Sequence, residues 1–410
     1  MRDRITVPGD ALAPQSGRRP PAAARAVLRV LEAIRHGSLE IQLPDGTTSR
    51  FGSRADGQPR ASMRLANWNV FGAALRAGDI GFAESFVAGD WHSPDLPALL
   101  ELFIANRESV EAVIYGSWWG SLLYRVKHLV HRNSRRGSKK NIHAHYDIGN
   151  EFYRQWLDPT MNYSSAWFEG DRSRDLVDAQ WAKARRALTE CAVRPGDRVL
   201  EIGCGWGALA ECAARDFGAD VHGVTLSTEQ LAWAQARLAQ AGLEGDLRFQ
   251  DYRDIDDGPY DAIVSIEMFE AVGRTYWPTF FETVRAQLKP GGKACIQSIT
   301  IRDDLFERYV HSTDFIQQYI FPGGLLPSRE AFRAAAGAAG LKIVEELAFG
   351  LDYAETVRRW RARFLGVEGP VRKLGFDTRF MRIWDFYLAY CEAAFETGNT
   401  SVMQFTLQHA

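Results

Sequence analysis

The stretch that decides the fold is VLEIGCGWGALA, residues 199–210. It begins as an apolar run, passes an acid at Glu201, and reaches three glycines, Gly203, Gly205 and Gly207. An apolar strand that ends in a glycine-rich turn and leads into a helix is typical of nucleotide-binding α/β folds, because glycine lets the backbone turn sharply and approach a ligand. The stretch therefore predicts a strand, a ligand-binding loop and a helix, in that order.

The spacing of the glycines distinguishes between three kinds of ligand. A phosphate-binding loop needs GxxxxGK[ST], and neither Lys nor Ser follows the loop here. A dinucleotide fold has GxGxxG and an acid at the end of the second strand, whereas this chain has GxGxG and a second strand that ends Thr225-Leu226-Ser227. An acid just before GxGxG is the usual mark of folds that bind S-adenosylmethionine, which has no phosphate. We interpret the loop in this way.

The sequence after the loop alternates between strand and helix patterns. The expected strands are residues 220–227, 246–252, 260–268 and 293–299, and the expected helices are residues 207–217, 228–242 and 276–292. Such alternation predicts a parallel, doubly wound sheet. A helical insertion at about 301–335 and late strands at 341–350 and 402–408 complete the expected α/β domain. Insertions at this place lie over the carboxyl ends of the strands, where ligands bind.

The composition and the first third of the chain limit the class of protein and the cell compartment that we expect. The chain has 410 residues, is 46% hydrophobic and carries a formal net charge of −2, so it can bury a large core and has no overall field for nucleic acid. Residues 1–23 are expected to be a disordered tail, and residues 24–123 a small α+β domain with a hairpin at 38–52. No run approaches the roughly 20 apolar residues of a membrane-spanning helix. Five cysteines without a CxxC pair fit a reducing cytoplasm.

A basic segment, residues 124–142, follows this domain. It contains Arg and Lys residues and no acid: Arg125, Lys127, Arg132, Arg135, Arg136, Lys139 and Lys140. Two interpretations stay open, a solvated linker and a patch that meets anionic lipid at about 1 kcal/mol per residue. Nucleic acid is a third, weaker option, since no nucleic-acid-binding motif accompanies the segment.

Six stretches in order carry a resemblance to a known family. They are HYDIGNEFYRQWLDPTMNYSSAWF (145–168), VLEIGCGWGALA (199–210), GVTLSTEQ (223–230), QDYRD (250–254), MFEAVG (268–273) and QQYIFPGGLLPS (317–328). Together they resemble the cyclopropane-fatty-acid synthase family, over nearly the whole chain after the tail. The resemblance implies a class I methyltransferase fold with helical insertions for residues 143–410, and a lipid-binding or dimerisation role for residues 24–123. It also implies a cytoplasmic enzyme that acts at the inner membrane surface on the cis double bond of unsaturated phospholipid acyl chains, often as a homodimer.

The same resemblance assigns the cofactor site. By motif, the residues expected to meet S-adenosylmethionine are Tyr163, Ser164, Glu201, Gly203, Gly205, Trp206, Gly207, Thr225, Leu226, Gln230, Asp251 and Tyr252. A metal is not expected, because His143 and His145 have no third ligand at useful spacing.

The family holds a bicarbonate ion as its base, through a Glu, a His, a Tyr and backbone N–H groups. Glu270 and Tyr319 match the Glu and the Tyr, and Ser165 stands where the family has a Cys that offers its backbone N–H. Gln297 replaces the His, and Glu267 stands where the family usually has Gly. The resemblance thus implies bicarbonate, while these two departures leave its binding open.

The expected methyl transfer suggests a role for Glu267, the carboxylate that VSIEMFEAVG (264–273) has where the family usually has Gly. Methyl transfer to an alkene leaves a carbocation, which needs a dry site, nearby negative or π density, and a base. Glu267 could bind the sulfonium end of the cofactor or take the proton itself; the other interpretation is a surface or paired acid. The departures favour a methylene or methyl-branched product over a cyclopropane ring, which stays the alternative. A small-molecule methyltransferase and a non-catalytic lipid-binding protein remain as rivals.

Overall fold

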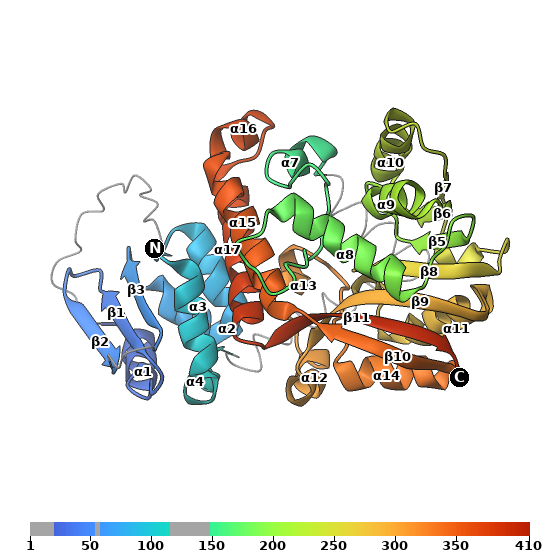
Figure 1. Cartoon of the computed structure of the whole chain (residues 1–410). Coiled ribbons are helices and arrows are strands. Elements are labelled where there is room, and N and C mark those ends of the chain that lie inside the picture. The colour runs from blue at the N-terminus through green and yellow to red at the C-terminus, as the bar shows by residue number, and fades with distance from the viewer. Residues whose placement is uncertain (1–19, 54–57, 115–147) are drawn as a thin grey trace. The chain divides into compact units, whose positions relative to one another are not determined.

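A seven-stranded sheet forms the centre of the C-terminal unit in a computed structural model of the chain, which describes residues 20–53, 58–114 and 148–410 (Figure 1). The chain divides into two units, Met1–Ser121 and Leu122–Ala410. Each unit has a sheet of its own. We describe them separately.

The strand order in the C-terminal unit is β10-β11-β9-β8-β5-β6-β7. The strands are β5 (Arg198–Ile202), β6 (Asp220–Thr225), β7 (Asp246–Phe249), β8 (Tyr260–Ile266), β9 (Leu288–Ile301), β10 (Leu341–Ala348) and β11 (Thr400–His409). Strands β5 to β9 run parallel, and β11 pairs antiparallel with both β9 and β10. The doubly wound α/β sheet is therefore confirmed, with two reversed strands added at one edge. The strand order reverses between β5 and β8, and ligands bind at such a switch point.

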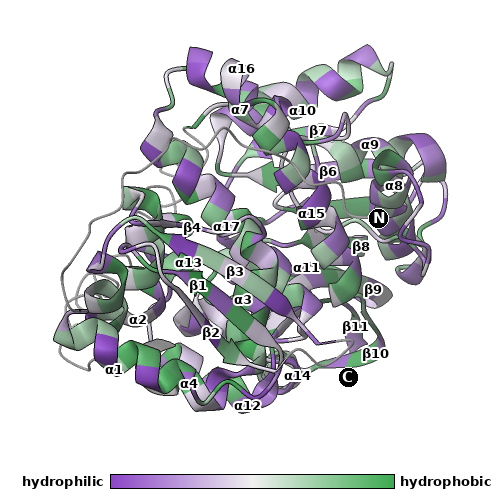
Figure 2. Cartoon of the chain, turned by 90° about the vertical axis from the view of Figure 1, so that its left-hand side faces the viewer, coloured by the Kyte–Doolittle hydropathy of each residue, from purple (hydrophilic) through white to green (hydrophobic). Residues whose placement is uncertain are grey.

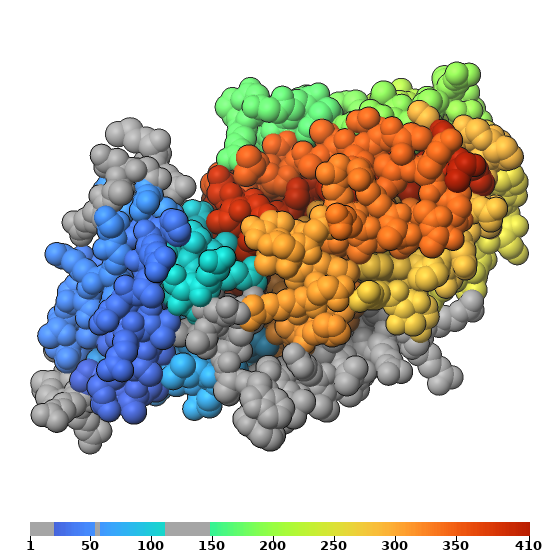
Figure 3. All heavy atoms as spheres, turned by 90° about the horizontal axis from the view of Figure 1, so that it is seen from below, coloured from blue at the N-terminus to red at the C-terminus, as the bar shows by residue number. Residues whose placement is uncertain are grey.

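Helices cover both faces of this sheet (Figure 1). One apolar cluster joins the sheet to α8 (Leu176–Glu190), α9 (Ala208–Phe217) and α10 (Thr228–Gln240). The other joins it to α11 (Trp277–Gln287) and α14 (Arg329–Ala338). In Figure 3 the residues after β9, coloured orange, form a large part of the visible surface of this unit. The two clusters hold the strand ends, and thus the loops that follow them, in fixed positions.

Shorter elements surround the carboxyl ends of the strands. They are α7 (Asn150–Arg154), the single turns η1 (Tyr252–Asp254), η2 (Phe269–Ala271) and η3 (Arg274–Tyr276), and the insertion helices α12 (Asp303–Val310) and α13 (Phe315–Tyr319). After β10 the chain forms α15 (Gly350–Gly366), α16 (Glu368–Lys373) and α17 (Thr378–Glu396), and α15 packs against α17. The sequence patterns did not assign these last three helices.

Some expected boundaries were wrong. The strand expected over residues 246–252 ends at Phe249. The helix expected over residues 276–292 ends at Gln287, and β9 begins at Leu288, so Lys289-Pro290-Gly291-Gly292 belongs to the strand. Leu288 is already extended, with φ −95° and ψ 130°. Pro290 disfavours helical backbone at Lys289, the residue before it, so the helix has to end before that lysine.

The N-terminal unit has a sheet with the order β2-β1-β3-β4 and four described helices. Its elements are α1 (Ala22–Leu31), β1 (Ser38–Gln42), β2 (Thr48–Gly52), β3 (Arg60–Leu65), α2 (Asn69–Ala88), β4 (Trp91–His92), α3 (Leu96–Ala105) and α4 (Arg107–Ile114). The hairpin expected at 38–52 is confirmed as the antiparallel pair of β1 and β2. Hydrophobic and hydrophilic residues alternate along α1 (Figure 2), whose buried side chains are Ala24, Val27 and Leu31.

Some expectations concern residues outside the described ranges. Most of the tail at 1–23 is among them, although α1 already begins at Ala22. The basic segment 124–142 and the pair His143 and His145 also lie outside the described residues. In the part of the chain that is described, none of the helices has the length and apolar character needed to cross a membrane.

Candidate active site

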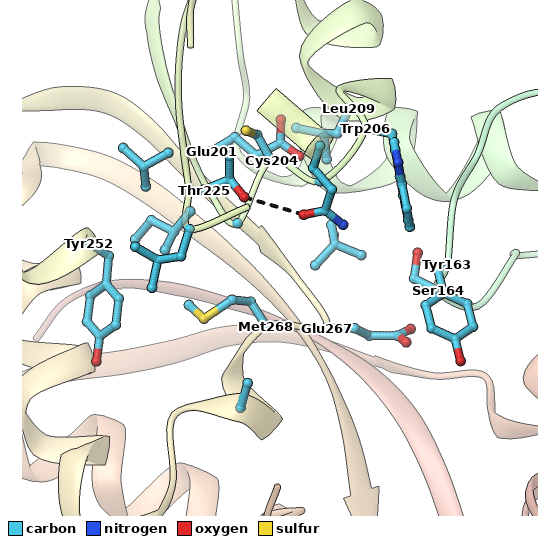
Figure 4. Close-up of a pocket in the computed structure, with 18 of the residues that line it drawn as sticks. Tyr163, Ser164, Glu201, Cys204, Trp206, Leu209, Thr225, Tyr252, Glu267 and Met268 are labelled. Carbon is cyan, nitrogen blue, oxygen red and sulfur yellow. Dashed lines mark hydrogen bonds between the residues drawn. The ribbon is translucent and has the colours of Figure 1, made fainter. Parts of the chain in front are cut away.

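A pocket opens at the carboxyl ends of β5, β6, β7 and β8, where the strand order reverses (Figure 4). The residues of the expected cofactor site that line it are Tyr163, Ser164, Glu201, Gly203, Gly205, Trp206, Thr225, Leu226, Gln230, Asp251 and Tyr252. Met268 and Glu267 lie on the opposite wall from Glu201 and Trp206, and Tyr252 lies far from Tyr163 (Figure 4). The wall is thus built from the ends of four strands and from one loop that precedes the sheet.

Gly207, which was expected on the cofactor, is not among the lining residues. It precedes α9 with φ 79°, and a Cβ added there would lie 2.8 Å from Cβ of Ala234 in α10. Gly203 has φ 87°, and a Cβ there would lie 2.9 Å from Cγ of Met268. Gly207 therefore allows two helices to pack, whereas Gly203 keeps the pocket wall open.

The acid before the glycines has the surroundings of a ligand-binding group. Glu201 is buried at the end of β5, and one of its carboxylate oxygens has no hydrogen-bond partner in the protein. Burial raises the pKa of this carboxyl to about 8. A buried polar atom without a partner is rare in native structures, so this oxygen is available for a donor on a ligand.

The far side of the pocket offers groups suited to a nucleoside. The Thr225 hydroxyl donates to Gln230 Oε1 at 3.4 Å (Figure 4), and the Asp251 carboxylate accepts from Arg253 Nε at 2.8 Å. Tyr252 adds an aromatic ring. Together with Glu201, these residues fit the amino-acid tail, ribose and adenine of S-adenosylmethionine, and the pocket needs no phosphate-binding loop.

The loop that carries Tyr163, Ser164 and Ser165 is fixed by α8. Lys183 Nζ donates to the Ser164 hydroxyl at 2.6 Å, and Gln180 Nε2 donates to the Ser164 carbonyl at 2.9 Å. Lys183 is buried, and burial lowers its pKa to about 8. The sequence analysis missed this lysine, because on α8 it reads as an ordinary helix residue.

Glu267 is the centre of a hydrogen-bonded cluster. Its Oε1 accepts from the Ser165 backbone N–H at 2.9 Å and from Gln297 Nε2 at 2.7 Å. Its Oε2 accepts from the Tyr353 hydroxyl at 2.6 Å. Its backbone is left-handed, with φ 51°, a region that few residues other than glycine adopt. The strand expected over residues 260–268 ends at Ile266 and the single turn η2 starts at Phe269, so Glu267 lies in the link between them.

A row of buried amides fixes the orientation of Gln297. Arg186 donates to Gln404 Oε1 at 2.7 Å, and Gln404 Nε2 donates to Gln297 Oε1 at 3.0 Å. Gln404 lies opposite Gln297 in the antiparallel pair of β11 and β9. Because Gln297 Oε1 is engaged in this way, the amide NH₂ of Gln297 must face Glu267.

The second carboxylate, Glu270, has different partners. Its Oε1 accepts from the Ile299 backbone N–H and from the Ser298 hydroxyl, and its Oε2 is buried without a hydrogen-bond partner. Burial, followed by the nearby charge of Glu267, raises the pKa of Glu270 to about 8. Tyr319 lies at the end of α13 with its ring 5.2 Å from that of Phe315, outside the lining of the pocket. Tyr353, which the sequence analysis did not name, donates to a carboxylate of this pair.

One group of possible metal ligands occurs among the described residues, and it is remote from this pocket. His222, Asp246 and Asp257 lie within reach of one ion. Arg248 pairs with both carboxylates and Arg198 lies 3.9 Å from Asp257, so two guanidinium groups already balance the two carboxylates.

Comparisons with known proteins agree with this site. Residues 133–405 match the family described as mycolic acid cyclopropane synthetase. The chain is 39% identical over 407 residues to the tuberculostearic acid methyltransferase UfaA1 of Mycobacterium tuberculosis, which covers 95% of this chain and 93% of that protein. It is 33% identical over 377 residues to the cyclopropane-fatty-acyl-phospholipid synthase of Escherichia coli, with 89% and 94% covered.

A solved structure shows the same fold. The crystal structure of mycolic acid cyclopropane synthase CmaA1, complexed with SAH and CTAB, superposes with a TM-score of 0.62 at 32% identity. The match covers 66% of this chain and 98% of that one. The resemblance stated from the motifs is therefore confirmed: the chain belongs to the mycolic acid cyclopropane synthetase family, and it is an S-adenosylmethionine-dependent methyltransferase.

Proposed function

We propose that this enzyme methylates the cis double bond of an unsaturated acyl chain in a membrane phospholipid, giving a methylene or methyl-branched chain. Two relatives aligned along most of the chain are named for reactions on fatty acids or fatty acyl phospholipids. The more similar of these two is named for tuberculostearic acid, which is a methyl-branched fatty acid. Its name supports a product without a ring.

The observation that carries the proposal is that a carboxylate and aromatic rings meet at the Tyr163 end of the pocket. There the Glu267 carboxylate faces Tyr163 (Figure 4), whose ring centroid lies 5.6 Å from that of Trp156 and 5.5 Å from that of Trp360. S-adenosylmethionine, when bound, supplies a methyl group on a positively charged sulfur. Aromatic rings and a carboxylate stabilise the positive charge that methyl transfer leaves on an alkene, and the apolar surroundings exclude water.

Two products are compatible with such a cation. If the transferred methyl group loses a proton directly, the electron pair closes a cyclopropane ring. If a hydride first moves from the methylated carbon to its neighbour, proton loss gives a methylene or a methyl-branched alkene. Glu267 and Gln297 differ from the usual family residues beside this cation, which favours the second outcome. The cyclopropane synthase remains the second candidate, supported by the Escherichia coli relative.

The setting of the reaction is part of the proposal. The enzyme would work in the cytoplasm, at the inner membrane surface, with residues 124–142 near anionic lipid and residues 24–123 serving lipid binding or dimerisation. The support is the charge of the first segment, the resemblance to the family, and a phospholipid synthase among the relatives. Analytical ultracentrifugation of the full chain tests the homodimer.

Expression in a host rich in cis-monounsaturated phospholipid, but without its own synthase, tests the reaction. The fatty acyl methyl esters are analysed by gas chromatography and mass spectrometry, before and after catalytic hydrogenation. We expect a species one CH₂ heavier that takes up hydrogen to give a methyl-branched chain. The same mass resistant to hydrogenation would mean a cyclopropane, and no new acyl species would contradict the proposed function.

A further inference from the structure

The family resemblance implies a bound bicarbonate ion as the base, but the residues that would hold it are already engaged. Ser165 was expected to offer its backbone N–H to the ion, and Gln297 stands in the place of the histidine. Both donate instead to Oε1 of Glu267, at 2.9 and 2.7 Å. A third donor, the Tyr353 hydroxyl, occupies Oε2 at 2.6 Å. The donors that suit a planar oxyanion therefore surround a carboxylate of the protein itself.

The local charges also disfavour a second anion. Burial, and after it the charge of Glu267, raises the pKa of Glu270, so a further negative charge beside this pair is unfavourable. The cation that acts on Glu267 is Lys183, whose charge Glu201 and Asp158 share. A bicarbonate ion placed beside Glu267 would meet like charge where its hydrogen-bond donors are already used. The residues present do not fit the ion.

The backbone indicates that this arrangement is specific. Glu267 holds φ 51°, where a non-glycine residue costs roughly 1 to 3 kcal/mol, and such strain persists mainly at functional sites. The left-handed turn directs the side chain from the end of β8 into the pocket, toward Ser164 and Tyr163 (Figure 4). A glycine, as in the usual family pattern, would leave the donors free for an ion.

We infer that the carboxylate of Glu267 replaces bicarbonate and is the proton acceptor of the reaction; this inference rests on the proposed function. In the final step, after the hydride shift, a C–H bond of the transferred methyl group breaks, and its electron pair forms the second bond of a double bond to the cationic carbon that carries this group. The proton passes to an oxygen of Glu267, which becomes a carboxylic acid and later returns the proton to water. The balance of atoms and charge needs no further reactant.

The test compares the full-length protein with Glu267→Gly and Glu267→Gln. Glycine suits φ 51° and empties the cluster, whereas glutamine fills it without a basic oxygen. In CO₂-depleted buffer we expect the turnover of wild type to be unchanged by added bicarbonate. Both variants should lose turnover by about 10²-fold or more, the usual range for a general base. Bicarbonate should restore part of it in Glu267→Gly only.

A binding measurement separates this inference from the proposed function. In the presence of S-adenosylhomocysteine, ¹³C-bicarbonate should show binding by NMR to Glu267→Gly and none to wild type or Glu267→Gln. Binding to wild type, or bicarbonate-dependent turnover of wild type, would overturn the inference. Full activity of Glu267→Gly without bicarbonate would overturn it as well. Failure of wild type to methylate acyl chains would instead contradict the proposed function, and the binding result would still decide whether Glu267 fills the anion site.

Discussion

Glu267 has a strained backbone and accepts hydrogen bonds from three donors. The pKa of its carboxyl depends on the balance between its burial and these donors. Burial raises the pKa of its carboxyl, while Tyr353, the Ser165 N–H, Lys183 and Gln297 lower it, in that order of effect. The net direction is upward, so Glu267 takes up its proton at a higher pH than a free glutamic acid does. A base must be ionised, and activity should therefore fall as the pH falls through this pKa.

Replacing Tyr353 by Phe tests this balance at one atom. The change removes the donor to Oε2 and leaves the ring, so the pKa of Glu267 should rise further. We expect the acidic limb of the pH–rate profile to move to higher pH, with turnover near neutral pH lowered about tenfold, because a hydrogen bond to a charged group is worth about 1.5–3 kcal/mol.

The matched control is Tyr260→Phe, since the Tyr260 hydroxyl also donates to a carboxylate, that of Asp257, but lies at the opposite end of β8 and outside the lining of the pocket. Its pH–rate profile should keep the position of the wild-type acidic limb. If Tyr353→Phe and wild type have the same acidic limb, Glu267 is not the group that titrates.

The sequence analysis named the centre of this cluster and two of its donors, but it missed the partners that come from later elements. Glu267, Ser165 and Gln297 were named from the motif positions around them. Tyr353 and Gln404 were not, because each belongs to an element remote in sequence, 86 residues from Glu267 and 107 from Gln297 respectively. Local patterns report burial and periodicity, and only the packing of α15 and the pairing of β11 bring these side chains to the site.

At the scale of elements, β11 orients a residue of β9. Gln404→Leu should keep the strand pair, since leucine suits a buried strand, and release the amide of Gln297 to rotate. The carbonyl oxygen of Gln297 could then face Glu267, which is repulsive. We expect turnover to fall about tenfold, as a lost hydrogen bond and a new repulsion together cost about 1.4 kcal/mol or more.

Calorimetry with S-adenosylhomocysteine accompanies this measurement and should give an unchanged dissociation constant, because Gln404 does not line the pocket. Wild-type turnover in Gln404→Leu would show that the amide row does not position Gln297. A weakened ligand affinity would point to a general disturbance of the sheet instead.

The glycines of the loop have two different roles: one allows helices to pack, and another lies at the ligand pocket. Gly207→Ala would bring Cβ to 2.8 Å from Ala234 and force φ 79° on alanine, so it should lower the free energy of unfolding by about 2 kcal/mol or more. Gly205 also has a positive φ, 50°, but a Cβ there meets nothing within 4 Å. Gly205→Ala should cost about 1 kcal/mol of stability and, because it lines the pocket, weaken S-adenosylhomocysteine about tenfold.

Urea denaturation and calorimetry on both variants check this division. Equal losses of stability would contradict the packing role of Gly207. The GxGxG spacing alone predicted a ligand contact for all three glycines, and it could not distinguish Gly207, because the reason for that glycine is a helix 27 positions later in the chain.

Most elements of the sheet could be read from the sequence, and the exceptions have physical causes. Strands β5, β6 and β8 are largely apolar runs that begin after clear turns, whereas β7 and β8 end before the expected residues, at Phe249 and Ile266. The end of α11 was misplaced because glycine is a common helix stop, whereas the preceding Pro290 had already ended the helix. The helices α15 and α17 pack on each other and on β11, and the charged residues between their buried positions obscured the helical period in the sequence.

At the scale of the whole molecule, the basic segment raises the question of how a protein without a described spanning helix reaches a phospholipid. Within residues 124–142 seven Arg and Lys residues occur without an acid, while the whole chain carries a net charge of −2. Such a segment is attracted to an anionic surface at about 1 kcal/mol per residue, an attraction that salt weakens.

Neutralising four of these charges tests the membrane contact. The test variant replaces four residues by glutamine: Arg135, Arg136, Lys139 and Lys140. The control makes the same change of charge at exposed positions of the C-terminal unit: Lys342, Arg363, Lys373 and Arg379. At about 1 kcal/mol each, the test variant should lose up to about 10³-fold in affinity for vesicles rich in phosphatidylglycerol, measured by co-sedimentation at low salt. The control should lose much less, and neither variant should change its binding to phosphatidylcholine vesicles. Equal losses in both variants would mean that net charge, rather than this segment, attracts the enzyme to lipid, and residues 124–142 would then be a linker.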